Sequence, residues 1–296
     1  LFLSPFSIST AFAMAYGGAR GTTQSEMSAV LHFPLEQGRL HPVFHELLKS
    51  LDTGVGLDGY RLDVANRLWG QAGYRFLPDH LALTREQYAA ELATVDFAAQ
   101  SEAVRAQINA WVEEKTQRKI HDLLPPGSLQ PSTVLVLTNA IYFKGKWQTQ
   151  YDPKKTFDAP FHVDAARSVT VPMMHMSAEL SLGHAPGAQL LELPYSGRDL
   201  SMLILLPDAV NGLPALEQAL TPANLELWRG TLHTTESNAY LPRFTVTSSF
   251  SLKEALAALG MPAAFSDAAD FSGMNGTGGL TITDALHKAF VSVNEE

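Results

Sequence analysis

The alternation of apolar and polar residues predicts a chain that is rich in helix in its first half and rich in strand in its second half. An apolar, alanine-rich run after Ser4-Pro5 predicts a buried helix over residues 4–16, with Ser4 as the N-cap and Pro5 in the first turn. Residues 101–124 carry apolar side chains at helical spacing and predict an amphipathic helix. Together these patterns indicate an α+β fold.

The second half of the chain contains most of the expected strands. Short apolar or alternating runs predict strands over 168–174, 179–184, 188–194, 200–206 and 236–246. A helix that ends at Gly260 follows, and the last strand is expected over 280–293.

The stretch 134–147, VLVLTNAIYFKGKW, is apolar at both odd and even positions. That pattern is typical of a central strand that is covered on both faces. Asn139 lies in the middle of this strand, and a buried amide costs free energy unless its donors and acceptors are paired. We therefore expect polar partners from elsewhere in the chain, although a core asparagine bonded to nearby backbone is the simpler alternative.

Composition and charge exclude several classes of partner. The 296 residues are 46% hydrophobic, which is enough for one large domain or two smaller ones. A net charge of −9 argues against a nucleic-acid partner and against a heparin-type site. The sequence contains no run of 18 apolar residues, so it predicts no membrane span. The chain has no cysteine, which excludes disulfides and thiol chemistry and leaves the compartment open.

No motif in this sequence supports catalysis, cofactor binding or metal binding. Residues 54–59 match GxGxxG, but a strand follows where a dinucleotide site needs a helix, so we expect a turn. His45-Glu46 begins a near match to HExxH in which Lys49 replaces the second histidine, and we interpret His41 and His45 as a surface pair rather than a metal site. Neither GxSxG nor SxxK occurs. The sequence therefore predicts no cofactor, no metal and no enzymatic activity.

Several segments resemble the serpins, a family of serine protease inhibitors, in both order and spacing. They are SPFSIS at 4–9, TNAIYFKGKW at 138–147, FHVD at 161–164, VPMM at 171–174, LELPY at 191–195, LPRF at 241–244, LGM and AF within 259–265, and ITDALHKAFVSVNEE at 282–296. The resemblance covers essentially the whole chain. It implies one domain over residues 1–296, built from a large central β-sheet, two smaller sheets and surrounding helices. The chain starts without Met and ends straight after a strand, so we expect a fragment that lacks the first helix, the reactive loop and the C-terminal strands.

The resemblance also implies a function. An inhibitory serpin is a suicide substrate: a protease cleaves its reactive loop, and the loop then inserts into the large sheet and distorts the trapped protease. The implied partner is a serine protease, with a cysteine protease as the alternative, and the complete protein is expected to be a monomer. The expected location is outside the cell, with the cytoplasm as the alternative. A non-inhibitory serpin, acting as a binding, carrier or chaperone-like module, is the competing hypothesis, whereas a hydrolase has no support.

Four residues match the family's shutter, a polar cluster that must break and re-form when two parallel strands separate. They are Ser4, Ser7, Asn139 and His287, and the two strands are the segments 134–147 and 280–295. A core histidine that is simply hydrogen-bonded is the alternative interpretation of His287.

Three further residues match the family's breach, at the end of the sheet where insertion begins. They are Trp147, Arg243 and Glu295, and for Trp147 the alternative is ordinary packing at the rim. Glu295 and Glu296 match the proximal hinge of the reactive loop. We predict an exposed salt bridge between Arg243 and Glu295, which would contribute about 0–1 kcal/mol to stability.

Overall fold

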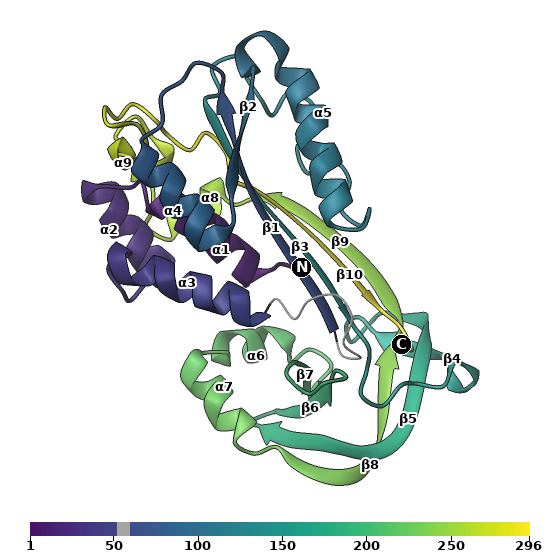
Figure 1. Ribbon diagram of the computed structural model, residues 1–296. Coiled ribbons are helices and arrows are strands. Elements are labelled where there is room, and N and C mark those ends of the chain that lie inside the picture. Colours follow the sequence, from purple (N-terminus) through teal and green to yellow (C-terminus); the bar gives the residue numbers. More distant parts are fainter. Residues whose placement is uncertain (52–59) are drawn as a thin grey trace. The chain divides into compact units, whose positions relative to one another are not determined.

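The computed structural model describes residues 1–51 and 60–296 (Figure 1), and they divide into two compact units. The first unit contains the described residues up to Leu51, Arg61–Phe143 and Val246–Val291, and the second contains Lys144–Thr245 and Ser292–Glu296. The single domain expected over 1–296 stays a prediction. The glycine motif at 54–59 lies outside the described residues. No helix in the described part is both long and apolar enough to cross a membrane.

The first unit holds most of the helices. They are α1 (Pro5–Tyr16), α2 (Gly21–Val30), α3 (Gln37–Leu51), α4 (Pro78–Tyr88), α5 (Phe97–Lys115), α8 (Lys253–Ala258) and α9 (Ser272–Asn275). Its strands are β1 (Tyr60–Gln71), β2 (Glu91–Val95), β3 (Leu135–Gly145), β9 (Phe244–Ser251) and β10 (Leu286–Val293), some of which continue into the second unit. One sheet has the order β2-β1-β3, and β10 pairs with β9.

The first helix begins as the sequence predicts. Ser4 has an extended backbone and its Oγ accepts a hydrogen bond from the N–H of Ser7, while Pro5 occupies the first helical position. Ala13 and Met14 have no exposed surface, and α1 is the centre of an apolar cluster to which α2, α3, α4 and α8 contribute. The predicted α+β class is confirmed, and α1 fills the core of the first unit.

The prediction of a central strand at 134–147 is only partly correct. Both faces of β3 are covered, because Val136 contacts the cluster under α5 while Leu135 and Leu137 contact the cluster around α1. However, β3 is an edge strand of its sheet, since β10 pairs with β9 and not with β3 among the described residues. Asn139 is consequently half-buried rather than fully buried.

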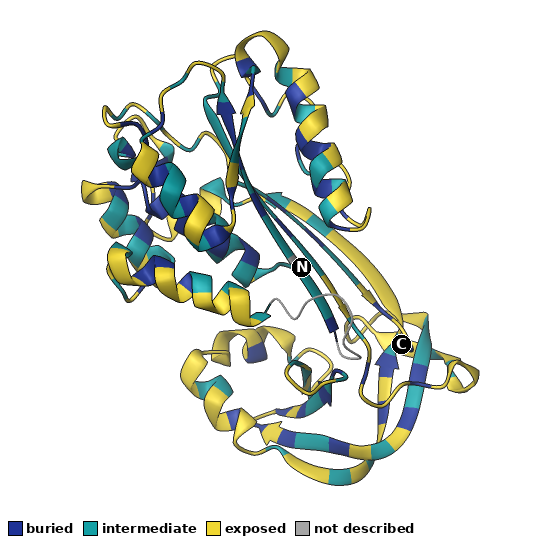
Figure 2. Cartoon of the chain, viewed as in Figure 1, coloured by how far each residue is buried: buried dark blue, intermediate teal, exposed yellow. Residues whose placement is uncertain are grey.

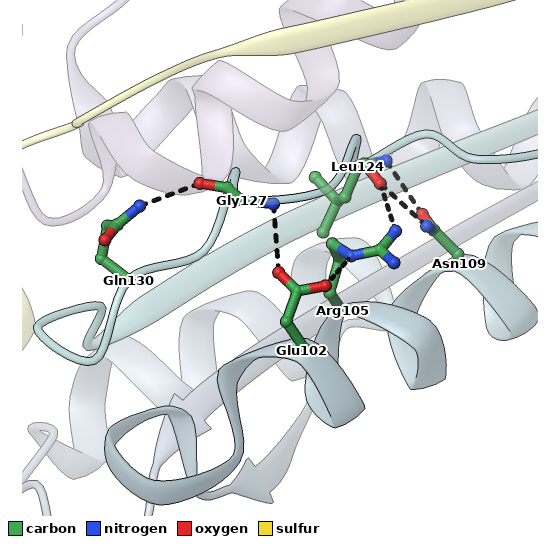
Figure 3. A network of polar contacts seen from close by, with 6 residues as sticks. All are labelled: Glu102, Arg105, Asn109, Leu124, Gly127 and Gln130. Carbon is green, nitrogen blue, oxygen red and sulfur yellow. Dashed lines mark hydrogen bonds and ion pairs between the residues drawn. The ribbon is translucent and has the colours of Figure 1, made fainter.

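Helix α5 is fastened to the segment that connects it to β3 (Figure 3). Asn109 forms two hydrogen bonds with the backbone of Leu124: its Nδ2 donates to the carbonyl at 2.9 Å, and its Oδ1 accepts from the N–H at 2.9 Å. Arg105 Nη1 donates to the same carbonyl at 2.9 Å. Asn109 is 5% exposed, and its contacts anchor the connection from the buried side of the helix.

A second set of contacts holds the same connection nearer its glycine turn. Glu102 Oε1 accepts from the N–H of Gly127 at 3.0 Å, and Gln130 Nε2 donates to the Gly127 carbonyl at 2.9 Å (Figure 3). Gly127 has a φ of 78°, a conformation that glycine adopts without strain. The apolar side chains of Leu124 and Leu129 are buried beneath the helix, where they join the cluster of Val104. Polar and apolar contacts thus fix one path for the connection.

The second unit is built mainly from antiparallel strands. They are β4 (Phe157–His162), β5 (Ser168–Ala185), β6 (Ala188–Pro194), β7 (Ser201–Pro207) and β8 (His233–Pro242), with the short turn η1 (Pro153–Lys155) before them. The sheet order is β4-β5-β6-β7, and β8 pairs with β5. Buried and exposed residues alternate along much of β5 and β8 (Figure 2). Helices α6 (Leu213–Ala219) and α7 (Pro222–Arg229) place Leu216 and Trp228 in the apolar cluster of β6.

Several boundaries differ from the sequence prediction. The strands expected at 168–174 and 179–184 form one strand, because residues 175–178 continue the ladder with β8. The last strand begins at Leu286 rather than at 280, after Asp284 has accepted hydrogen bonds from Ser251 Oγ and from the N–H of Ala285. The short helices α6 and α7 were not predicted, since seven or eight residues give little periodic signal.

The interpretation of His41 and His45 as a surface pair is wrong for His41. Its side chain is 2% exposed and its Nδ1 lies 2.7 Å from the hydroxyl oxygen of Tyr88. His80 on α4 is also buried, and neither of its ring nitrogens has a hydrogen-bond partner among the described residues. Burial lowers the pKa of His41 to about 4, and burial together with the charges of His41 and Arg20 lowers the pKa of His80 to about 4.

We predict that Asn109→Ala lowers the free energy of unfolding by about 2–3 kcal/mol, because it leaves the buried N–H and carbonyl of Leu124 with fewer partners. Gln107→Ala is the matched control, since Gln107 is exposed on the same helix and makes no side-chain bond in the described part. Urea unfolding of the full-length protein measures both. Equal stabilities for the two variants would contradict the fastening of α5 at Asn109.

We predict that acid destabilises the helices around His41 and His80. A histidine whose pKa is about 4 when folded and 6.5 when unfolded stabilises the fold fully above pH 6.5 and loses that contribution as the pH falls toward 4. One such histidine removes about 2 kcal/mol between pH 7 and pH 5.

His80→Leu should therefore reduce the loss of stability between pH 7 and pH 5, measured by urea unfolding at each pH. His121→Gln changes a histidine whose side chain is 57% exposed and serves as the control. If the slope of stability against pH is the same in His80→Leu and in the unaltered protein, burial of His80 is not the cause of acid sensitivity.

Candidate functional site

The strand β10 is joined to the first turn of α1 by His287. The backbone N–H of Ser4 donates to His287 Nε2 at 3.1 Å, and the N–H of Ser7 donates to Ser4 Oγ at 3.2 Å. His287 is 7% exposed and its ring lies beside Phe250, with 5.5 Å between ring centroids. Burial lowers the pKa of His287. Burial thus favours the neutral imidazole at neutral pH, and the hydrogen bond from Ser4 requires Nε2 to be the unprotonated nitrogen of that ring.

The polar contacts continue from α1 across two strands. Ser7 Oγ donates to Asn139 Oδ1 on β3, and Asn139 Nδ2 donates to Asn66 Oδ1 on β1 at 2.7 Å. Asn66 Nδ2 in turn donates to the carbonyl of Tyr88, at the end of α4, at 2.8 Å. A continuous set of hydrogen bonds therefore links β10, α1, β3, β1 and α4.

Sequence reasoning missed Asn66, although a usable signal was present. Asn66 is 8% exposed and has the same strand parity as Leu68, which has no exposed surface. A polar residue at a buried parity needs partners, which is the argument that drew attention to Asn139. Thr138 was missed as well: its Oγ1 accepts from Trp69 Nε1 at 3.0 Å and donates to the Arg67 carbonyl at 3.2 Å.

In the second unit, Trp147 is hydrogen-bonded to Asn294 and Glu296. Its indole Nε1 donates to the carbonyl of Asn294 at 2.8 Å, and its backbone N–H donates to the carbonyl of Glu296 at 2.9 Å. The indole ring is stacked on Tyr195, with centroids 5.0 Å apart and planes 13° apart. Trp147 is 4% exposed, so it is part of a packed corner and not of an open rim.

The predicted contact between Arg243 and Glu295 is present, with 3.4 Å between Arg243 Nη1 and Glu295 Oε1. It is not the exposed pair that the sequence predicts, because Glu295 is 8% exposed. Its carbonyl accepts from the N–H of Tyr151 at 3.1 Å, and its Oε1 accepts from Thr156 Oγ1 at 2.8 Å. Burial opposes the charged form of Glu295, but hydrogen bonds from Thr156 and from its own backbone, with the charge of Arg243, hold its pKa below the usual value.

Glu296 is more exposed than its neighbour. Its carboxylate lies 3.7 Å from Lys144 Nζ, with both side chains more than half exposed, so this ion pair adds little stability. Within the part of the chain that the structure describes, His, Cys, Asp and Glu residues form no group of three or more that could hold a metal ion.

Comparison with known proteins identifies the family. The family model described as Serpin (serine protease inhibitor) matches residues 1–296. The chain belongs to the serpin family. It is 46% identical to the leukocyte elastase inhibitor of Bos taurus, over all of this chain and 80% of that protein.

Solved structures agree with this assignment. Emu ovalbumin superposes with a TM-score of 0.96 at 32% identity, covering 100% of this serpin and 80% of the ovalbumin chain. A loop-inserted structure of a P1–P1′ cleaved ovalbumin mutant superposes with a TM-score of 0.93 at 31% identity, covering 99% and 81% of the two chains. The predicted serpin fold is thereby confirmed, and serine protease inhibition is the function that the family and its elastase-inhibitor members support.

The site residues expected in a serpin form two groups. Ser4, Ser7, Asn139 and His287 are brought together by hydrogen bonds within the first unit, although His287 contacts Ser4 and no bond joins it directly to Asn139 in the described part. Trp147, Arg243, Glu295 and Glu296 are brought together within the second unit. The roles of these residues in opening the sheet stay predictions.

We predict that Asn139→Ala lowers the free energy of unfolding by about 2–3 kcal/mol, because Ser7 Oγ and Asn66 Oδ1 both lose a partner in a largely buried place. Lys144→Ala on the same strand is the control, with an expected loss below about 0.5 kcal/mol. A double-mutant cycle of Ser7→Ala with Asn139→Ala should give a coupling of about 0.5 kcal/mol or more. Strict additivity of the two losses would show that the contact contributes no coupling energy.

Proposed function

We propose that this serpin inhibits a serine protease as a suicide substrate, and that its reactive loop inserts as a new strand between β3 and β10. The proposal rests on one observation. Side chains of β3 and β10 contact the same two apolar clusters, while no backbone hydrogen-bond ladder joins the two strands in the described part of the chain.

The arrangement of apolar clusters supports parallel neighbours. Val136 of β3 and Leu286 of β10 contact one cluster, and Ala140 and Phe290, four residues further along each strand, share the next. The two strands therefore run in the same direction. Each has an edge whose backbone N–H and carbonyl groups are available to a strand added between them, which is the requirement for β-strand addition.

The hydrogen-bonded network of Ser4, Ser7, Asn139 and His287 suits a region in which two strands must separate and close again. A typical hydrogen bond contributes only about 0.5–1.5 kcal/mol net, because water or a new partner can replace the lost one. Strands held by such contacts can separate at lower cost than strands that share a continuous ladder. We assign these four residues to the shutter.

The corner around Trp147 suits the place where insertion begins. Glu295 and Glu296 are held to it by two backbone hydrogen bonds, by Thr156 and by Arg243, so the start of the reactive loop has a fixed origin. Breaking the contacts with both Arg243 and Thr156 would free the Glu295 carboxylate. We assign Trp147, Arg243 and Glu295 to the breach, and Glu295 with Glu296 to the proximal hinge.

The non-inhibitory serpin is the competing function. The two functions differ in what the residues after Glu296 must do. An inhibitor needs small residues there that can become a buried strand, whereas proline or bulky charged residues would block insertion.

The partner and the compartment belong to the same proposal. We propose a serine protease as the target, with a cysteine protease as the alternative, and a monomer as the active form. Outside the cell is the proposed location and the cytoplasm the alternative, both of which suit a chain without cysteine. Assay of the culture medium and of the cell lysate for the full-length protein would separate them.

We predict a covalent complex with a target protease. Full-length protein incubated with a panel of serine and cysteine proteases should give a band at the summed mass on a denaturing gel, because the acyl-enzyme is trapped. Thr156→Val together with Arg243→Gln should change the rate at which the complex forms, since both side chains hold Glu295. Loop cleavage with no complex and no gain in thermal stability would instead support the non-inhibitory function.

A further inference from the structure

The dipeptide Asn-Gly occurs twice in the sequence, at Asn211-Gly212 and at Asn275-Gly276. An asparagine followed by glycine is prone to lose its side-chain amide, because glycine has no Cβ to shield the backbone nitrogen that attacks the asparagine. The fold places the two pairs in opposite environments. Asn211 is exposed in the turn between β7 and α6 (Figure 1), whereas Asn275 is 7% exposed at the end of α9.

The side chain of Asn275 is held in place by four hydrogen bonds. Its Nδ2 donates to the hydroxyl oxygen of Tyr74 and to the carbonyl of Gly278, both at 2.8 Å. Its Oδ1 accepts from the N–H groups of the second and third residues after it, at 3.0 and 2.9 Å. The N–H of Gly276 donates to the Ser272 carbonyl at 2.7 Å. Reaction between Asn275 and Gly276 therefore requires local unfolding.

The side chain of Asn211 is held much less firmly. Its Oδ1 accepts from the N–H of Ala165 at 3.2 Å, and its Nδ2 has no hydrogen-bond partner among the residues that the structure describes. The N–H of Gly212 donates to the carbonyl of Ala209 at 2.8 Å, within the same exposed turn. Reaction between Asn211 and Gly212 therefore needs only a rearrangement of that turn, without any opening of a packed core.

The packing of the turn requires glycine at position 212. A Cβ added there would lie 2.8 Å from the Cβ of Pro207 and 3.0 Å from the carbonyl oxygen of Ala209, distances at which one of the groups must move. The backbone nitrogen of Gly212 is consequently left without a side chain beside it. The reactive dipeptide is thus a consequence of the close approach between this turn and the end of β7.

We propose that Asn211 is a site of spontaneous deamidation in the folded protein. The backbone nitrogen of Gly212 forms a bond to Cγ of Asn211, the Cγ–Nδ2 bond breaks, and the proton of the attacking nitrogen leaves with the amide as ammonia. Water then opens the resulting succinimide ring at either carbonyl, which gives aspartate or isoaspartate. Water is the only co-reactant, nothing is oxidised or reduced, and the product carries one new negative charge.

The two products differ in their effect on the turn between β4 and β5, which contains Ala165. Aspartate keeps an oxygen that can accept from the N–H of Ala165. In isoaspartate the main chain passes through the former side chain and is longer by one methylene group, while Gly212 stays closely packed against Pro207. Isoaspartate should therefore displace the acceptor and loosen the β4–β5 turn.

The reaction is tested by peptide mapping of the full-length protein after incubation at mildly alkaline pH. Asn211 should deamidate at least about tenfold faster than Asn275, because the buried pair reacts only after local unfolding. In guanidinium chloride the two rates should converge, since both pairs are then equally accessible. An unreactive Asn211 in the folded protein, or the same ratio of rates with and without denaturant, would overturn the proposed site.

A variant tests whether Asn211 accounts for the change in charge. Incubation of the unaltered protein should produce a more acidic species on ion-exchange chromatography. Asn211→Gln should prevent its formation, because glutamine forms the corresponding ring far more slowly. If the acidic species forms at the same rate in Asn211→Gln, the charge arises elsewhere and the assignment to Asn211 is wrong.

Hydrogen exchange at the amide of Ala165 tests the effect on the turn. Asn211→Asp reproduces the aspartate product and should leave this amide as protected as in fresh protein. Incubated protein that contains isoaspartate at position 211 should exchange the same amide faster. Equal exchange in fresh protein, incubated protein and Asn211→Asp would overturn the loosening of the β4–β5 turn.

Discussion

The hydrogen bond between Asn139 and Asn66 is the contact on which the arrangement of the first unit depends. On one side it continues through Ser7 and Ser4 to His287, and on the other it continues to the Tyr88 carbonyl. No backbone ladder joins β3 to β10 in the described residues. These side-chain hydrogen bonds connect the two strands instead, through α1. The position of β10 beside β3 is thus set by a few replaceable contacts and by the apolar clusters under α5.

The two kinds of contact have different physical roles. Apolar clusters around α1 and under α5 supply most of the stability, since burial of a large aliphatic or aromatic side chain contributes about 1.5–3 kcal/mol. Polar contacts at Asn139, His287 and Glu295 contribute less, but they are directional and fail cooperatively when one partner moves. A protein whose function requires a sheet to open is well served by stable layers joined through weaker, specific links.

Much of this arrangement could be predicted from the sequence where the signal is local or repeated in the family pattern. Ser4-Pro5 defines a helix start within two residues, and the matches at Ser7, Asn139 and His287 identified polar groups that the fold brings into one network. Asn66 shares the strand parity of the apolar Leu68, which indicates a buried position, but parity does not reveal which neighbouring strand supplies its partner. His41 was misjudged for a related reason: helical spacing shows that residues share a face, and tertiary packing decides whether that face is covered.

The edge position of β3 and the burial of Glu295 show the same limit of local patterns. An apolar run predicts that both faces of a strand are covered, and both faces of β3 are. The same pattern does not show which edges of the strand are hydrogen-bonded to a neighbour. Glu295 is charged and follows a strand, so exposure was the natural expectation. Its burial results from Tyr151, Thr156 and Arg243, which lie more than fifty residues earlier in the chain.

Ser4 performs two tasks at once, and this couples a helix end to a strand. Its hydroxyl caps α1 through the N–H of Ser7, while its own backbone N–H is held by His287. Fraying of the first turn of α1 would break its hydrogen bond to β10, and displacement of β10 would in turn loosen the cap. The amide protons of Ser4 and Ser7 should therefore exchange with solvent at rates that follow the position of β10, whose His287 is 283 residues from Ser4 in the sequence.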